Sequence, residues 1–114
     1  MGVTLHPLRP EPFASHVDVL TAAQYIERAI HARTAHAAAY WLRRARAQVL
    51  HARDYWRTAG QPTLAAWSDE VAARLGGLAA TASGLRPAGL AGWQSGVLYP
   101  FQGYMATLDR AGRW

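Results

Sequence analysis

The feature that most constrains the fold is the absence of glycine and proline between Ala14 and Ala59. Since these two residues most often interrupt or end helices, the stretch predicts helix over most of its length. Within it, Thr21-Ala-Ala-Gln24 has the form of a capping box. That motif predicts a helix start near Ala22.

The same stretch has a predicted end and a predicted break. Gly60 and Pro62 indicate that the helix stops near Thr58. One unbroken helix would span about 55 Å, whereas a compact domain of about 100 residues has a radius of gyration of about 13 Å. We therefore expect a break or bend around His31 to Ala35, and the alternative is a long projecting helix.

The second half of the stretch carries an apolar seam whose members are spaced by three and four residues, as on one face of a helix. The members of this seam are Ala35, Ala38, Leu42, Ala45, Val49, Ala52 and Trp56. Because most of them are alanine, another helix can approach closely. We expect the seam to be bundle core, and it also offers a surface for self-association.

Prolines divide the rest of the chain into further helices. Pro62 opens a region whose apolar residues again repeat at three and four, namely Leu64, Trp67, Val71, Leu75, Leu78, Ala82 and Leu85. Gly76-Gly77 either splits this helix or marks a close crossing. Pro87 suits the first position of another helix, and Pro100 is expected to restart the chain before a short last helix.

These elements predict an all-α fold. Residues 1–15 contain Pro7, Pro10 and Pro12 without periodicity, which indicates an extended N-terminal arm held to the body by Leu8 and Phe13. Residues 16–114 are expected to form a single small bundle of four to five helices. Strands are not expected, because the chain has few Val, Ile and Thr and no hairpin signal.

The residues that enzymes need are scarce. The chain has no cysteine and no lysine, which excludes disulfides, thiolate metal sites and a Walker motif. His31 and His36 are five residues apart and therefore point to different helix faces. Gly92-Trp-Gln-Ser-Gly96 departs from the G-x-S-x-G nucleophile elbow. We expect a protein that is not an enzyme and that uses no metal or cofactor.

The sequence also predicts no membrane association. The long charge-free stretch between Arg86 and Asp109 contains prolines, glycines and glutamines, which suit a membrane span poorly. The first residues lack the basic and apolar regions of a signal peptide. The expected location is the cytoplasm.

The charge of the chain is concentrated in one segment. The net charge is +5, and all twelve basic residues are arginine. Residues 28–57 hold seven of these arginines and a single acid, Asp54, for a net charge of +6, whereas the rest of the chain has a net charge of −1. A localised excess of arginine favours a polyanionic partner.

Helical geometry arranges these arginines in a row. At about 100° per residue, one face beside the apolar seam carries Arg43, Arg46, Arg53 and Arg57. Arg28 joins the row if the helix is continuous, while Arg44 leaves it. Tyr40 and Tyr55 lie nearby and are candidates for stacking on unpaired bases.

The row needs a partner because only Asp54 on the same helix is placed to relieve its self-repulsion. Three partners remain open: solvent or acids elsewhere in the fold, an acidic protein, or the phosphates of a nucleic acid. The absence of base-reading motifs favours contact with the phosphate backbone, independent of base sequence.

With its small size, helical pattern, lack of cysteine and arginine face, the chain resembles the small helical subunit of multisubunit (class 1) CRISPR effector complexes. The resemblance implies a non-catalytic subunit of a ribonucleoprotein that lines the path of guide RNA or target strand beside other protein subunits. Two alternatives are a structural assembly protein, such as a phage or virion component, and a small dimeric regulator that does not bind nucleic acid.

Overall fold

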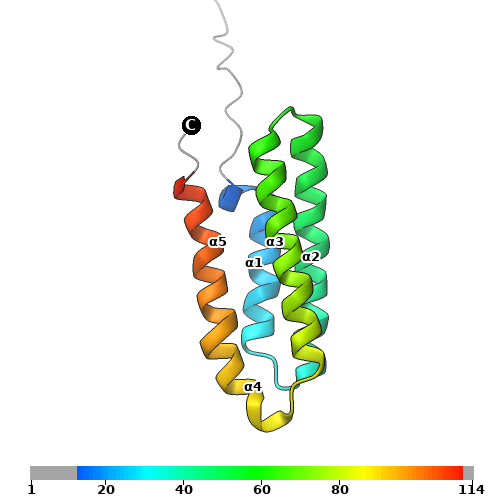
Figure 1. The fold of residues 1–114 in the computed structure, drawn as a ribbon, viewed down its shortest axis with the longest axis vertical. Helices are drawn as coiled ribbons and strands as arrows, with labels where there is room; N and C mark the ends of the chain where they lie inside the picture. Colours follow the sequence, from blue (N-terminus) through cyan, green and yellow to red (C-terminus); the bar gives the residue numbers. More distant parts are fainter. Residues whose placement is uncertain (1–12, 112–114) are drawn as a thin grey trace, which may run out of the picture.

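The computed structural model describes residues 13–111, with side chains for residues 13–108. Three long helices run alternately up and down: α1 (Val17–Ile30), α2 (Ala35–Thr58) and α3 (Pro62–Ser83). A short 3-10 turn, η1 (Phe13–Ser15), precedes α1. In Figure 1, α2 and α3 lie side by side at one side of the bundle, and α1 lies between them and the last helix.

The last rod of the bundle is built from three consecutive segments, α4 (Pro87–Trp93), the π-helical segment η2 (Gln94–Leu98) and α5 (Tyr99–Ala111). It starts at the lower end of the bundle and returns alongside α1 (Figure 1). Residues 13–111 are thus an all-helical bundle, as the sequence predicts, and no strand occurs among them.

The expected restart at Pro100 is wrong, because the helical rod passes through this residue without a break. A proline inside an α-helix has no N–H to donate and collides with the carbonyl four residues earlier. Here the wider π turn lies directly before it, and such turns relieve the crowding. Gln94, at the start of the π segment, donates hydrogen bonds from Nε2 to the carbonyl oxygens of Ala29 and Ala32, at 2.9 and 2.8 Å.

The first long helix begins earlier than the capping box predicts. α1 starts at Val17, and the Nδ1 atom of the buried His16 accepts a hydrogen bond from the backbone N–H of Asp18 at 3.1 Å. Thr21 lies inside the helix, where its hydroxyl donates to the carbonyl of Val17. Histidine is an uncommon residue at a helix N-cap. The commoner Thr-x-x-Gln pattern therefore predicts the start of this helix at the wrong turn.

The predicted break between α1 and α2 is confirmed. α1 ends at Ile30, and the Thr34 hydroxyl caps α2 by accepting from the N–H of Ala37. The far end of α2 is closed by Gly60, whose φ of 72° suits a residue without a side chain. The N–H groups of Gly60 and Gln61 bond back to Arg57 and Trp56, as in a Schellman motif.

The alanine-rich seam of α2 forms the centre of the core. All of its members except Ala35 are buried, and each of these buried members is 0% exposed. α3 contributes buried small residues to the same core, namely Ala65, Ser68, Ala72, Ala79 and Ala82, beside the larger Leu64, Val71 and Leu75. The buried members of the seam therefore pack within the bundle of the same chain.

The face of α3 differs from the predicted stripe in one respect. Trp67, Leu78 and Leu85 are only partly buried, whereas Leu64, Val71 and Leu75 are fully buried. The large side chains of α3 therefore differ in burial, although all six are predicted to share one buried stripe.

The predicted N-terminal arm of residues 1–15 lies mostly outside the described residues, as does Leu8. Its last part, Phe13–Ser15, belongs to the bundle: Phe13 is fully buried and stacks on Trp56 with ring centroids 5.5 Å apart. Among the described residues, no helix is both long and apolar enough to cross a membrane.

The packing of α2 predicts the effect of enlarging a seam residue. We expect Ala45→Leu to lower the free energy of unfolding by about 1–3 kcal/mol, because Ala45 is fully buried and the core has no space for the added atoms. Ala47→Leu, on the exposed side of the same helix, should change it by less than about 0.5 kcal/mol. Urea denaturation followed by circular dichroism measures both, and equal effects would contradict the close packing.

Candidate nucleic-acid interface

The predicted arginine row of α2 lies along the edge where α2 meets α3, and the structure divides it into two pairs. Arg53 and Arg57, toward the end of α2, face Asp69 of α3. Their guanidinium nitrogens lie 3.0 and 3.3 Å from its carboxylate oxygens. Arg53 also contacts Asp54 at 3.1 Å. Acids within the fold therefore compensate part of the charge of this pair.

The hydrogen bonds of Arg53 fix the position of its guanidinium group. Its contact with Asp69, followed by that with Asp54, raises the pKa of Arg53 above its ordinary value. The group is therefore a cation with both carboxylates as fixed neighbours. An incoming phosphate would have to compete with Asp69 for the donors of Arg53 and Arg57.

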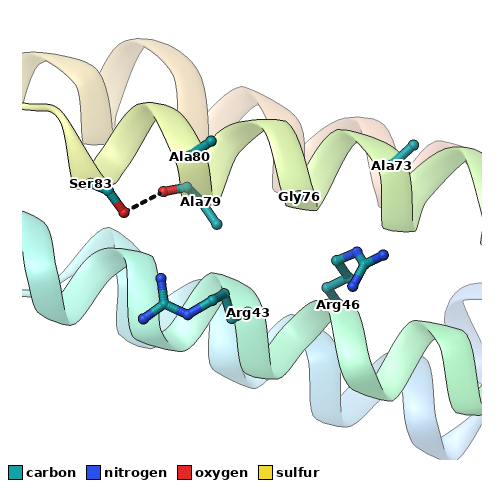
Figure 2. A pocket seen from close by; sticks show the side chains of 7 residues that line it. All are labelled: Arg43, Arg46, Ala73, Gly76, Ala79, Ala80 and Ser83. Carbon is teal, nitrogen blue, oxygen red and sulfur yellow. Dashed lines mark hydrogen bonds between the residues drawn. The ribbon is translucent and has the colours of Figure 1, made fainter.

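The other pair, Arg43 and Arg46, opens onto a groove of about 430 Å³ between α2 and α3 (Figure 2). The α3 side of this groove consists only of small residues, Ala73, Gly76, Ala79, Ala80 and Ser83. Among residues 13–108, no carboxylate lies within ion-pairing distance of either arginine. Both side chains are exposed at the surface.

The register of the two helices explains this division. α2 and α3 are antiparallel, and Asp69 lies opposite Arg53. Gly76, seven residues after Asp69, lies opposite Arg46, which is seven residues before Arg53. Seven residues are about two helical turns, so the same faces meet again. A Cβ atom at Gly76 would lie 3.4 Å from Nε of Arg46, which shows how closely the arginine stem crosses α3.

The helix continues through Gly76-Gly77, so these residues do not split it. The alternative prediction is that Gly76-Gly77 marks a close crossing of helices. Gly76 does have a close neighbour, but this neighbour is the Arg46 side chain rather than a helix backbone. The small residues of α3 are the half of the groove that sequence reasoning did not identify. A recurrence of small residues at positions 73, 76, 80 and 83 was the available signal, but it does not by itself indicate which residues of α2 lie opposite.

Among residues 13–108, the acids other than Asp54 and Asp69 contact groups outside the groove. Asp18 and Glu27 of α1 contact His51 and His31. Glu70 of α3 contacts Arg74 and accepts a hydrogen bond from the hydroxyl of Tyr104. Residues 71–108 contain no acid. Among residues 13–108, no carboxylate therefore neutralises the two arginines that border the groove.

The remaining predicted contact residues lie outside the groove. Arg28 is on α1, beyond the break, and its guanidinium lies over the ring of Trp41 at 4.8 Å. It does not extend the α2 row, since that arrangement required one continuous helix. Tyr40 is exposed on the side of α2 nearer α1, and Tyr55 is exposed beside His16.

Two further results complete the description of the site. Among the described residues, no group of three or more His, Cys, Asp or Glu side chains is placed to hold a metal ion. Comparisons with protein-family models, with curated proteins and with solved structures find no match to this chain.

One titratable contact on the exposed side of α2 gives a pH prediction. Nδ1 of His51 lies 2.6 Å from Oδ2 of Asp18, and this hydrogen bond, followed by the charge of Asp18, raises the pKa of His51 above 6.5. Because the folded state binds the proton more tightly, the contact stabilises the fold fully below pH 6.5. That contribution is lost as the pH rises through the folded-state pKa of His51.

We expect Asp18→Asn to lower the pKa of His51, measured by NMR titration of its ring protons. Asp54→Asn is the control, because Asp54 contributes least to the shift and its removal should have a smaller effect. An unchanged pKa of His51 in Asp18→Asn would contradict the contact.

Proposed function

We propose that this protein is a non-catalytic subunit that binds the phosphate backbone of a nucleic acid, independent of base sequence, within a larger ribonucleoprotein assembly. One observation carries the proposal: Arg43 and Arg46 have no carboxylate partner in residues 13–108 and border an open groove of small residues. Two unpaired cations side by side repel each other, so an anion placed between them would be bound favourably.

The chemistry of the groove favours phosphate over an acidic protein surface. Arginine presents a planar fork of donors that matches a phosphate group with two parallel hydrogen bonds. The opposite side of the groove consists of Ala, Gly and Ser, which let a bulky sugar-phosphate chain approach without steric conflict. Protein interfaces usually centre on buried aromatic or large apolar anchors, and no such residue lines this groove.

The paired arginines have a smaller part in this proposal. The charges of Arg53 and Arg57 are balanced by Asp54 and Asp69, although Arg57 is exposed and keeps donors free for a secondary contact. Membership of the small subunits of class 1 CRISPR effector complexes, a guide RNA or target strand as ligand, and a cytoplasmic location belong to the same proposal. They rest on the resemblance in size and arginine pattern.

The proposal predicts a specific change in salt dependence. We expect the double variant Arg43→Gln/Arg46→Gln to bind single-stranded RNA or DNA more weakly, with the slope of log K against log salt less steep by about 1.4. This value follows from about 0.7 for each phosphate contact to a single strand. Fluorescence anisotropy of a labelled 20-mer between 50 and 200 mM salt measures the slope.

The control for this experiment is the double variant Arg33→Gln/Arg86→Gln. It loses the same formal charge from exposed positions that do not line the groove. Its slope should stay close to that of the wild type. If both double variants lose affinity equally, binding depends on net charge alone, and if the wild type fails to bind at 50 mM salt, the proposed function is wrong.

The pairing of the second half of the row predicts an effect of opposite sign. We expect Asp69→Asn to increase affinity for nucleic acid, since it releases Arg53 and Arg57 and removes a negative charge from the same surface. Glu70→Gln, which removes an adjacent charge that contacts neither arginine, serves as the matched control. A weaker complex with Asp69→Asn would show that the salt bridges position the arginines instead of masking them.

A further inference from the structure

A second cluster of arginines lies on the adjacent face of α2, where it meets α1, and aromatic rings surround these arginines. The Trp41 ring has the Arg28 guanidinium at 4.8 Å from its centroid and the Tyr25 ring stacked at 5.5 Å with an interplanar angle of 26°. Tyr40 meets Trp41 edge to face at 5.0 Å. Two helices thus contribute to one continuous aromatic surface.

Arg44 closes this surface on its other side. Its guanidinium lies 5.3 Å from the Tyr25 ring and 5.8 Å from the Tyr40 ring. It donates hydrogen bonds of 3.3 Å to the hydroxyls of both tyrosines. These contacts with neutral hydroxyls orient the guanidinium plane of Arg44 but do not neutralise its charge. Among residues 13–108, no carboxylate pairs with Arg28 or Arg44.

This cluster and the groove are on adjacent faces of one helix at the same level. Arg43 and Arg44 are consecutive, so their side chains leave α2 about 100° apart. One borders the groove toward α3 and the other contacts α1. The ridge between them carries the exposed, small Ala47. A helix with its side chains is about 10–12 Å wide, so a chain of a few nucleotides is long enough to reach both.

We propose, resting on the function proposed above, that the ligand is a single strand that crosses α2, with phosphates at Arg43 and Arg46 and unpaired bases stacked on the cluster of Tyr25, Arg28, Tyr40, Trp41 and Arg44. The bases of a duplex are stacked on each other and unavailable to such a surface. Aromatic rings and arginine planes stack on exposed bases of any sequence. The surface therefore binds single strands in preference to duplexes, whatever their base sequence.

The exposure of the cluster identifies its contact residue. Tyr40 is 42% exposed, and Arg28 and Arg44 are also exposed, whereas Tyr25 and Trp41 are partly buried and support them from below. Tyr40 is therefore the ring on which a base would stack. Tyr55 is more exposed, at 54%, but lies about three to four helical turns away, beside His16, and has no arginine over its ring.

The test compares Tyr40→Leu with Tyr55→Leu in the full chain, using anisotropy with a labelled 20-mer of deoxythymidine and with a 20-base-pair duplex. Loss of one stacked base is worth about 1–3 kcal/mol, which corresponds to a roughly 5- to 150-fold loss of affinity. We expect that loss for Tyr40→Leu with the single strand only. The duplex should be unaffected, and Tyr55→Leu should match the wild type with both ligands.

The outcomes separate this inference from the proposed function. If Tyr40→Leu matches the wild type while Arg43→Gln/Arg46→Gln still weakens binding, the phosphate site stands and the base platform is wrong. If Tyr40→Leu weakens both ligands equally, the aromatic cluster only maintains the fold, which thermal unfolding of the variant would confirm. If the wild type binds neither ligand at low salt, both proposals fail. If polyglutamate displaces the single strand at equal charge concentration, the cluster recognises acidic protein.

Discussion

The packing of α2 against α3 is the interaction on which the rest of the structure depends. These two helices form the most extensive helix contact in the described part of the chain, and both contribute large and small buried side chains to it. Arg43 and Arg46 leave α2 at the edge of this contact, beside the small residues of α3 that border the groove. Arg46 passing beside Gly76 is the clearest example.

The same packing determines which arginines are neutralised. Helical geometry places Arg43, Arg46, Arg53 and Arg57 on one face, but their charges depend on the residues of α3 at the same level. A single acid, Asp69, meets the last two, and alanine, glycine and serine meet the first two. The electrostatic division of the row is thus a property of the pair of helices and not of either helix alone.

Local patterns of the sequence predict a large part of this fold. The 3-4 spacing identifies the buried face of α2, and Gly60 with Pro62 locates its end, since both depend only on neighbours along one helix. The start of α1 was missed because a histidine rather than Thr21 caps it. The continuous last rod was missed because a π turn accommodates Pro100. In both cases the chain forms a local structure that is less common than the one its sequence pattern predicts.

The candidate site was less predictable, because its contacts join residues far apart in the chain. The pairing of Arg53 with Asp69 spans 16 residues, and that of Arg44 with Tyr25 spans 19. Both follow from the register and rotation of packed helices, which a helical wheel does not contain. The wheel correctly separated Arg44 from the row, but it could not show that Arg44 faces two tyrosines.

The position of Asp69 also gives the proposed ligand a direction. A phosphate chain held by Arg43 and Arg46 meets a carboxylate if it continues along α2 toward Arg53, and like charges at close range repel. In the other direction, across the ridge at Ala47, it meets Arg44 and then Arg28, whose partners are neutral rings. Among the described acids, Glu27 is engaged with His31 on α1, and Asp18 with His51. The arrangement of charge therefore favours a strand that crosses the helix over one that follows it, and this path is the one that brings bases to the aromatic cluster.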